Sequence, residues 1–294
     1  MTSYNKFNLE TQIIGIIGHP IKHTYSPLMH NISFELKNLN YIYLPFDVPF
    51  NTLKAAINGM VALGIKGFNI TLPHKENIIQ YLKNVSEEAS VIGAVNTVVN
   101  ENGILSGYNT DVHGITESLM PYKDELTGAD NVTVVGSGGA ARSAVYALIR
   151  NFRPKNINII NRTEQKAESL KEYFYSKMHY NNICSYELVP FDLVDVFKDS
   201  KLVINATSVG MSPNVDDAIT TIPQSFSKGQ IVFDFVYNPL QTKLLRIAEI
   251  EGATVIDGLK MLVYQGAKSF ELWTGEEMPV EQILKALKLY ISTN

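Results

Sequence analysis

A glycine-rich turn at Gly136 is the strongest chemical signal in the sequence. The segment Gly136-Ser137-Gly138-Gly139-Ala140-Ala141 follows the apolar run Val132 to Val135 and leads into an alanine-rich stretch. A strand that passes through glycines directly into a helix turns backbone N–H groups and the positive helix end toward a pyrophosphate. Such turns also serve as plain tight connections, but the preceding strand and following helix favour dinucleotide binding.

The next apolar strand discriminates between NADP and NAD. Proteins that bind NAD usually place Asp or Glu about 20 residues after the glycines, where it accepts a hydrogen bond from the ribose 2′-hydroxyl. Here the strand ends in Asn161-Arg162-Thr163, without a carboxylate. An arginine can bind a 2′-phosphate through two parallel hydrogen bonds, so the sequence favours NADP. In the alternative interpretation, Arg162 is a solvated residue and Thr163 caps the following helix.

Lys75 and Asp111 are the candidate acid–base residues. Lys75 ends the segment Asn69 to Lys75, in which Pro73 terminates a strand. Desolvation in a crevice can bring a lysine pKa into the range useful for proton transfer, although a single lysine is more often a surface residue. Asp111 begins a predicted helix and could act only as its N-cap. If both side chains converge, the carboxylate would keep Lys75 charged and oriented beside a carbonyl.

Two hydroxyl groups precede the first predicted helix, at Thr24 and Ser26. Together with free backbone N–H groups at a helix N-terminus, they suit a carboxylate ligand. Alternatively, Thr24 or Ser26 caps this helix, with Pro27 at its first position. The six histidines show no metal-ligand spacing, so no metal site is expected.

These residues belong to an α/β chain with two patterns of elements. In the first half, strands and helices alternate, and a hairpin is predicted at Gly103. The expected elements of this half are strands at 13–17, 41–47 and 65–71, helices at 27–36, 52–63 and 77–81, and hairpin strands at 95–99 and 104–108. From Asn131 onward, strand–helix repetition predicts a doubly wound parallel sheet.

The expected elements of the second half are strands at 132–135, 157–160, 202–206, 231–235 and 254–256, a helix from the glycine turn to about 151, and helices at 164–175, 258–273 and from 280. The last two helices must bury an apolar face, either in the second domain or on the first one.

Composition excludes several classes of protein. At 294 residues, 45% of them hydrophobic and 18% charged, the chain is typical of a globular protein with about two domains. It has no apolar run of membrane-spanning length and no secretory signal at its start, and its single cysteine, Cys184, fits a reducing cytoplasm. A formal charge of −4 gives no reason to expect nucleic acid or a membrane as partner.

Taken in order, the motifs resemble the shikimate dehydrogenase family over nearly the whole chain. They are Gly18-His19-Pro20-Ile21, His23-Thr24-Tyr25-Ser26-Pro27, Asn69 to Lys75, Gly93-Ala94-Val95-Asn96-Thr97, Asn109-Thr110-Asp111, the glycine turn, Asn161-Arg162-Thr163, Asn205 to Met211, Asp234, Tyr237, Pro239, Gln265-Gly266-Ala267 and Phe270 to Gly275. Any one of these blocks is unspecific, whereas all of them in this order are highly specific.

The resemblance implies NADPH-dependent reduction of 3-dehydroshikimate to shikimate, in chorismate and aromatic amino-acid biosynthesis. It implies a substrate-binding domain at residues 1–110, with 259–294 packing back onto it, and a Rossmann-like NADP-binding domain at 111–258, with the reaction in a cleft between them. Lys75 and Asp111 would be the catalytic pair. The substrate would be bound by Thr24, Ser26, Thr71, Asn96, Tyr237 and Gln265. Besides the glycine turn and Asn161-Arg162-Thr163, Thr207 and Gly258 would contact NADP.

One residue departs from the family pattern, because serine usually stands where this chain has Thr24. The added methyl group could narrow the pocket, so a quinate/shikimate dehydrogenase of broader substrate and cofactor use is one alternative. A ligand-sensing homologue without turnover is another, although retention of both Lys75 and Asp111 argues against it. A third is an NADP-dependent dehydrogenase of another two-domain family, such as the folate enzymes, which would leave the Thr24–Ser26 loop unexplained. A monomer or a homodimer is expected.

Overall fold

Two α/β units make up the chain in the computed structural model, which describes residues 7–21 and 24–293. The first unit comprises Met1–Thr110 and Val263–Asn294, and the second comprises Asp111–Leu262. The later division falls inside helix α10 (Leu259–Thr274), so this helix begins in the second unit and continues in the first. Among the described residues, none of the helices is both long and apolar enough to cross a membrane.

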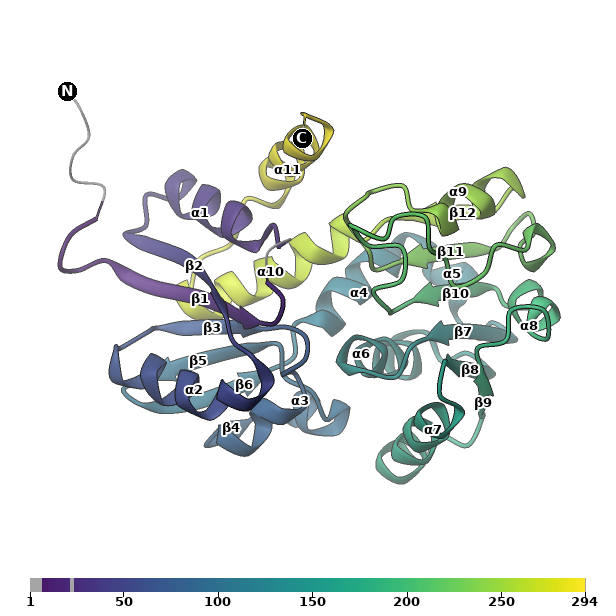
Figure 1. Cartoon of the computed structure of the whole chain (residues 1–294), viewed down its shortest axis with the longest axis horizontal. Helices are drawn as coiled ribbons and strands as arrows, with labels where there is room; N and C mark the ends of the chain where they lie inside the picture. Colours follow the sequence, from purple (N-terminus) through teal and green to yellow (C-terminus); the bar gives the residue numbers. More distant parts are fainter. Residues whose placement is uncertain (1–6, 22–23, 294) are drawn as a thin grey trace. The chain divides into compact units, whose positions relative to one another are not determined.

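The first unit is built on a mixed sheet with the strand order β2-β1-β3-β5-β6-β4 (Figure 1). The strands are β1 (Gln12–Gly18), β2 (Tyr41–Asp47), β3 (Gly67–Ile70), β4 (Asn84–Val85), β5 (Thr97–Glu101) and β6 (Ile104–Tyr108). β1 lies between β2 and β3 and pairs with both in parallel, while β5 pairs antiparallel with β3 and β6. The predicted hairpin is confirmed: both turn residues, Asn102 and Gly103, have positive φ angles, of 54° and 89°.

Helices cover both faces of this sheet. They are α1 (Ser26–Leu36), α2 (Leu53–Ala62), α3 (Glu87–Ile92) and the part of α10 from Val263, with 3₁₀ turns at Phe50–Thr52 and Asn77–Tyr81. The last helix, α11 (Val280–Thr293), packs against α1. On one face, Leu53 and Ile57 of α2 pack against Phe68 and Ile70 of β3. On the other face, α1 and α10 enclose an aromatic cluster around His30. The return of the C-terminal helices to the first unit is therefore confirmed.

The second unit has a parallel sheet with the order β12-β11-β10-β7-β8-β9, which is the doubly wound arrangement expected. Its strands are β7 (Asn131–Val135), β8 (Asn156–Asn161), β9 (Ile183–Glu187), β10 (Leu202–Asn205), β11 (Ile231–Asp234) and β12 (Thr254–Ile256). Its helices are α4 (Asp111–Leu119), α5 (Lys123–Leu126), α6 (Gly139–Ala147), α7 (Glu164–Met178), α8 (Val194–Lys198) and α9 (Lys243–Ile250), with 3₁₀ turns at Met120–Tyr122 and Pro223–Ser225.

Several features of the second unit differ from the sequence interpretation, which placed no helices at α5, α8 and α9. The helix after the glycine turn was expected to run to about Asn151, but α6 ends at Ala147 and continues as a π-helical turn, Leu148–Phe152. β9 was missed because its five residues include Cys184 and Ser185, which interrupt an apolar pattern. This strand is important for the site because it lies beside the end of β8.

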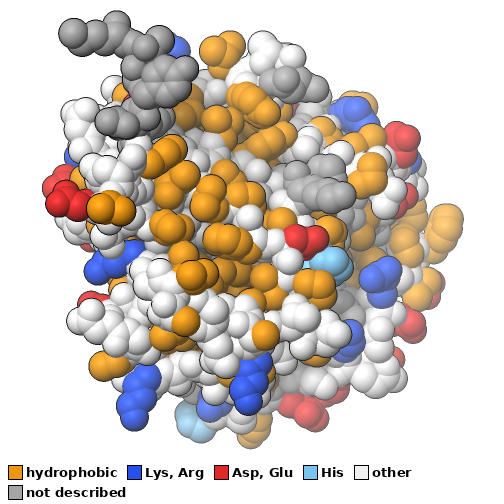
Figure 2. Space-filling view, turned by 60° about the vertical axis from the view of Figure 1, so that its left-hand side comes forward, with side chains coloured by type: hydrophobic (Ala, Val, Ile, Leu, Met, Phe, Trp, Pro, Cys, Tyr) orange, Lys and Arg blue, Asp and Glu red, His pale blue; other side chains and the backbone are white. Residues whose placement is uncertain are grey.

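The outer edge of the first sheet is apolar but blocked against further strand pairing. Hydrophobic side chains gather on this side of the first unit (Figure 2), and edge strand β2 contributes half-buried Ile42, Leu44 and Phe46. On its free edge, Tyr43 donates its N–H to Asn31 Oδ1 at 2.9 Å and accepts from Asn31 Nδ2 at 3.0 Å. Pro45 has no N–H to offer. The capping by Asn31 and the proline protect the edge from pairing with another chain.

His30 is fully buried in the aromatic cluster of the first unit. Its ring stacks on Tyr43 with a centroid distance of 4.5 Å and lies 5.4 Å from the Trp273 ring. Over the part of the chain that the structure describes, neither ring nitrogen has a hydrogen-bond partner. Burial lowers the pKa of His30 from 6.5 to about 3, because a buried imidazolium would be desolvated.

We expect His30→Phe to make the free energy of unfolding less sensitive to acid. The unfolded chain binds a proton at His30 below pH 6.5, whereas the folded chain stays neutral there down to about pH 3. Stability from this group is therefore lost as the pH falls through that window, by roughly 2 kcal/mol at about pH 5. Urea unfolding at about pH 7 and 5, followed by the fluorescence of Trp273, the single tryptophan, measures the difference. Equal acid sensitivity of both proteins would contradict the expectation.

Candidate active site

A buried polar network joins the central strands of the first unit to helix α10. Asn69 of β3 accepts from the Tyr43 hydroxyl at 2.7 Å and donates to Thr97 Oγ1 and Ser269 Oγ, both at 3.1 Å. Ser269 Oγ lies 2.8 Å from Thr97 Oγ1 and 3.0 Å from Thr110 Oγ1. Buried polar groups remain stable when their partners are all present, so this network fixes α10 against the sheet.

The network also determines which atoms Asn96 and Gln265 can present to a ligand. Asn96 Oδ1 accepts the backbone N–H of Thr110 at 2.7 Å, and a backbone N–H can only donate. The amide orientation of Asn96 is therefore fixed, and its Nδ2 donates to Thr110 Oγ1 at 2.9 Å and to Gln265 Oε1 at 3.3 Å. Because Gln265 accepts with Oε1, it offers Nε2 as a donor. Both Nδ2 hydrogens of Asn96 are used inside the network, so Gln265 Nε2 is the amide donor suited to a hydroxyl or carbonyl oxygen.

Thr24 and Ser26 lie together at the start of α1. The Thr24 hydroxyl donates to Ser26 Oγ at 3.1 Å and accepts the Ser26 backbone N–H at 3.2 Å. Tyr25 is the N-cap residue and its side chain makes no capping bond, but the Thr24 hydroxyl accepts the N–H of Ser26, the first residue of α1, so the capping alternative is borne out for Thr24. The Thr24 hydroxyl donates its hydrogen to Ser26 Oγ, so Ser26 is the hydroxyl with a hydrogen to give to a carboxylate beside the positive end of the helix. His23, the neighbour of Thr24 in this motif, lies outside the described residues.

Lys75 lies on the loop that follows β3, and backbone hydrogen bonds hold this loop on both sides. Thr71, at its start, donates its N–H to Ile17 O at 2.9 Å, and Lys75 O accepts the Val95 N–H at 2.8 Å. The Thr71 methyl group fills the space beside Gly18, where an added Cβ would come within 2.3 Å of it. The Lys75 side chain is half-buried. A cationic group on a fixed loop at the end of a strand is well placed for proton transfer.

Asp111 is the first residue of α4 and is only 3% exposed. A carboxylate in the first turn interacts favourably with the helix dipole. Its predecessor, Thr110, is held by Asn96, so the same network that orients Asn96 fixes where α4 begins. Lys75 belongs to the first unit and Asp111 to the second.

The glycine turn in the second unit has the geometry of a phosphate-binding loop. Gly136 has a φ of +123°, and an added Cβ would lie 3.2 Å from Ala206 O and 3.3 Å from the Thr207 methyl carbon. Gly138 is different, since its φ is −83° and an added Cβ would meet no atom within 4 Å. Neither backbone conformation nor packing requires glycine there, which suits a ligand that approaches the backbone.

The first turn of α6 supplies donors to this space. The first intrahelical hydrogen bond is donated by Arg142 to Gly138 O, so the N–H groups of Gly139, Ala140 and Ala141 precede it. These groups and the helix dipole fit a pyrophosphate, and Ser137 and Gly138 extend the same turn. The donor set therefore fits the dinucleotide expected from the sequence.

The end of β8 is basic and polar. Asn161 Nδ2 donates to Thr163 O at 3.0 Å, while Arg162 is exposed. Thr163 is the N-cap residue of α7, but its side chain makes no capping hydrogen bond, so the capping role proposed as an alternative is wrong. An exposed arginine without a carboxylate at Asn161 fits a 2′-phosphate better than a 2′-hydroxyl.

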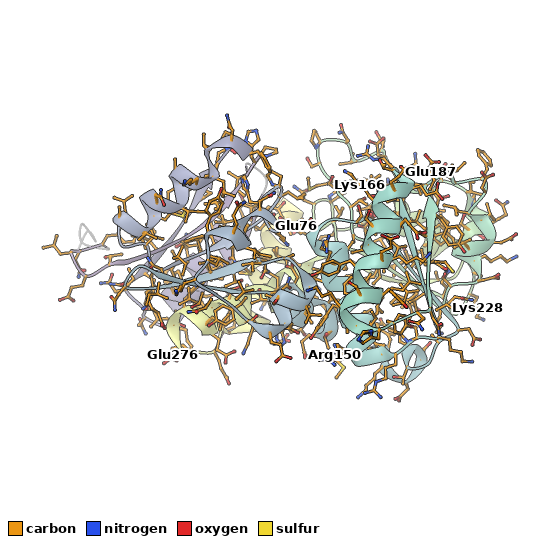
Figure 3. The ribbon with its side chains drawn as sticks, turned by 90° about the horizontal axis from the view of Figure 1, so that it is seen from below. Glu76, Arg150, Lys166, Glu187, Lys228 and Glu276 are labelled. Atoms are coloured by element: carbon orange, nitrogen blue, oxygen red, sulfur yellow. The ribbon has the colours of Figure 1, made fainter. Side chains whose placement is uncertain are left out.

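Two charged residues at this edge were missed in the sequence interpretation. Lys166 is exposed on the first turn of α7, and Glu187 is the last residue of β9, in register with Asn161 (Figure 3). Lys166 could have been found from its position four residues after Arg162. Glu187 could not, because its place depends on the pairing of β8 with β9.

The ends of β10 and β11 form a second buried network. Asp234 accepts from Asn205 Nδ2 at 2.9 Å, from the Thr242 hydroxyl at 2.7 Å and from the Val236 N–H at 3.0 Å. Asn205 Oδ1 in turn accepts the Thr207 hydroxyl at 2.6 Å. Desolvation raises the pKa of Asp234 from 3.8 to about 6, although these three hydrogen bonds oppose the shift. The network positions Thr207 beside the glycine turn.

Gly258 and Tyr237 follow the last strands of the second unit. An added Cβ on Gly258 would lie 2.3 Å from Phe235 O, so close backbone packing requires glycine at this position. Tyr237 is half-buried three residues after Asp234. It therefore belongs to the second unit, whereas Thr24, Ser26, Thr71, Asn96 and Gln265 belong to the first.

We expect Asp234→Asn to remove a pH dependence from the stability of the second unit. The folded chain keeps a proton on Asp234 up to about pH 6, whereas the unfolded chain releases it above 3.8. Stability from this group is present below the unfolded pKa and is lost as the pH rises through about 6, by up to roughly 3 kcal/mol. Asparagine keeps Oδ1 as acceptor for Asn205 and Val236 but cannot ionise.

Urea unfolding at about pH 4 and 7, followed by circular dichroism, compares the two proteins. Asp234→Ala serves as the control, because it leaves buried donors unpaired and should lower stability at both pH values. The same change of stability with pH in wild type and Asp234→Asn would show that the carboxyl group does not titrate in this range.

Three family models match successive parts of the chain. The model described as the shikimate dehydrogenase substrate binding domain matches residues 16–98, and the model described as shikimate/quinate 5-dehydrogenase matches residues 122–236. The model of the shikimate 5′-dehydrogenase C-terminal domain matches residues 258–288.

Whole proteins and solved structures give the same result. A shikimate dehydrogenase (NADP(+)) of Caldanaerobacter subterraneus subsp. tengcongensis is 45% identical over 92% of this chain and 94% of its own length. A crystal structure of a shikimate dehydrogenase in complex with NADP⁺ superposes with a TM-score of 0.87 at 40% identity, over 97% of both chains. The enzyme from Listeria monocytogenes, in complex with shikimate and NAD, has a TM-score of 0.84 at 36% identity, over 96% of this chain and 98% of its own.

Proposed function

The chain belongs to the shikimate dehydrogenase family, and we propose that it catalyses the reversible NADPH-dependent reduction of 3-dehydroshikimate to shikimate. The observation that carries this proposal is the fixed amide network of Asn96 and Gln265 in the first unit, in which Gln265 accepts with Oε1 and so offers Nε2 as a donor. A polyhydroxylated ring has oxygens that can accept from this donor, whereas an apolar substrate has none.

We assign the recognition of the substrate to residues of both units. Thr24 and Ser26 bind the carboxylate, because their hydroxyls lie side by side at a helix N-terminus. Gln265 donates from Nε2 to a ring oxygen, and Asn96 does so with the Nδ2 hydrogen that it otherwise gives to Gln265 Oε1. Thr71 and Tyr237 complete the set through their hydroxyl groups. Shikimic acids lacking a ring hydroxyl should bind more weakly, because a buried donor would lose its partner.

We assign proton transfer to the catalytic pair, Lys75 and Asp111. Reduction of the ring ketone takes up a hydride and a proton, and the Lys75 ammonium group delivers the proton to the developing alkoxide. Its positive charge also stabilises the negative charge on the oxygen as that charge develops. We assign to the carboxylate of Asp111 the orientation of this ammonium group. In shikimate oxidation, neutral Lys75 accepts the proton back.

NADPH supplies the hydride when bound. The N–H groups of Gly138, Gly139 and Ala140 and the Ser137 hydroxyl hold the pyrophosphate, with Gly136 providing the turn. Arg162, with Asn161 and Thr163, binds the 2′-phosphate, and Lys166 adds a second cation at the same edge. Thr207 and Gly258 line the remainder of the cofactor site. We also propose that the protein acts in the cytoplasm, where its single free cysteine, Cys184, would remain reduced.

The direct test follows absorbance at 340 nm with purified protein, using shikimate or quinate with NADP or NAD. We expect rapid turnover with shikimate and NADP only. Comparable turnover of quinate, or a preference for NAD, would favour the broader quinate/shikimate class, and Thr24→Ser would then be compared with the wild type. Cofactor binding without turnover of any pair would contradict the proposal and support a ligand-sensing protein.

A further inference from the structure

We propose that His74 is a positioning residue that holds the catalytic Lys75 loop in place through its imidazole ring. This inference rests on the proposed function, since it concerns the role assigned to Lys75. His74 immediately precedes Lys75 and is completely buried, with 0% exposure. Its ring Nε2 lies 2.6 Å from the carbonyl oxygen of Val48.

The contact with Val48 fixes which ring nitrogen of His74 donates. A carbonyl oxygen can only accept, so the proton must be on Nε2. Nδ1 is buried and has no hydrogen-bond partner among residues 7–21 and 24–293. His74 is therefore a donor to Val48 O through Nε2.

Through this hydrogen bond, the ring joins two loops at the same edge of the first sheet. Val48 follows β2 and donates its own N–H to Gly18 O at 2.9 Å. The loop of His74 follows β3, and its backbone bonds run to Thr71 O and from Ile78, both at 2.9 Å. These two bonds are local, and the longer-range backbone bonds of the loop run to Ile17, His19 and Val95, so none of them connects it to the loop after β2. The His74 ring supplies the connection.

The ring of Phe50 covers this tether. It stacks on His74 with a centroid distance of 6.2 Å and an interplanar angle of 17°, while 61% of Phe50 remains exposed. Shielded from water, the His74–Val48 hydrogen bond is stronger than it would be in solvent. Lys75 thus lies in the chain between the buried His74 and Glu76, which is labelled in Figure 3.

The tether should affect catalysis more than binding. Its removal leaves the carboxylate and amide contacts of the substrate unchanged, but it allows the Lys75 ammonium group to move relative to the ketone. A displacement of about 1 Å at a reacting group can reduce the rate about 100-fold. We therefore expect His74→Phe to lower kcat by about 10- to 100-fold, with KM for shikimate and NADP changed less than about threefold.

The matched variant is His74→Gln, because the glutamine Nε2 can reach the position of the imidazole Nε2 and donate to Val48 O. We expect it to retain kcat within about threefold of the wild type. Phe50→Leu retains His74 but removes the aromatic ring that stacks on it, so we expect an intermediate reduction of kcat. Thermal unfolding monitored by Trp273 fluorescence shows whether the variants are equally folded.

The decisive measurement combines kcat with hydrogen exchange of residues 71–78 in the full-length protein. Faster exchange and lower kcat in His74→Phe, both restored in His74→Gln, would support the tether. Equal losses of kcat in both variants, or a normal kcat in His74→Phe, would overturn it. If the wild type itself fails to oxidise shikimate, the proposed function is wrong. The exchange comparison still decides whether His74 holds the loop.

Discussion

Replacement of Lys75 by alanine is expected to lower kcat by about 100- to 10,000-fold, the range typical of positioned acid–base groups. The loss arises because the alkoxide formed on hydride transfer would have neither a proton donor nor a nearby positive charge. KM for shikimate should change much less, because the residues proposed to bind the substrate are unchanged. These are Thr24, Ser26, Asn96 and Gln265, and the bonds among them remain. Steady-state kinetics at 340 nm in both directions measures kcat and KM separately.

Lys83→Ala is the matched control for this experiment. Lys83 is an exposed lysine of the same unit, and its removal makes the same change of charge. Its kcat should equal that of the wild type. A rise in KM with unchanged kcat in Lys75→Ala would instead make Lys75 a binding residue, and proton transfer would have to be assigned to another group.

Replacement of Arg162 by alanine is expected to weaken NADP binding by about 10- to 100-fold, with little effect on NAD. A hydrogen bond to a charged group contributes about 1.5–3 kcal/mol, and the 2′-phosphate is the one part of NADP that NAD lacks. Since Arg162 is exposed at the end of β8, part of this contribution should be screened by salt. Calorimetric Kd values for both cofactors at low and high salt test the assignment without relying on turnover.

Lys198→Ala controls for the loss of a positive charge. Lys198 is exposed at the end of α8, just before β10 begins. It therefore lies toward the amino ends of the parallel strands, whereas Arg162 follows the carboxyl end of β8. Equal weakening of NADP and NAD by Arg162→Ala would place this arginine on the part shared by both cofactors. An unchanged Kd for NADP would contradict the assignment of Arg162, and Lys166, which remains in that variant, would be the candidate ligand of the 2′-phosphate.

The local geometry of the cofactor site could be derived from the sequence. The strand, glycine turn and helix around Gly136 are contiguous, so backbone conformation and hydrophobic pattern specify them together. The same holds for the hairpin at Asn102 and Gly103, where both residues accept positive φ angles. The doubly wound order of the second sheet followed from repeated strand–helix units and the handedness of their connections.

Other features of the site depended on the tertiary structure, because they join residues that are distant in the chain. Asn69 and Ser269 are 200 positions apart, yet their hydrogen bond helps to fix the helix that carries Gln265. The amide orientation of Asn96 follows from its contact with Thr110, and the tautomer of His74 follows from its contact with Val48. Residue types and spacing identified which side chains can do the chemistry. Long-range packing decided which atoms of those side chains donate and accept, since hydrogen-bond direction depends on partners that the local sequence does not contain.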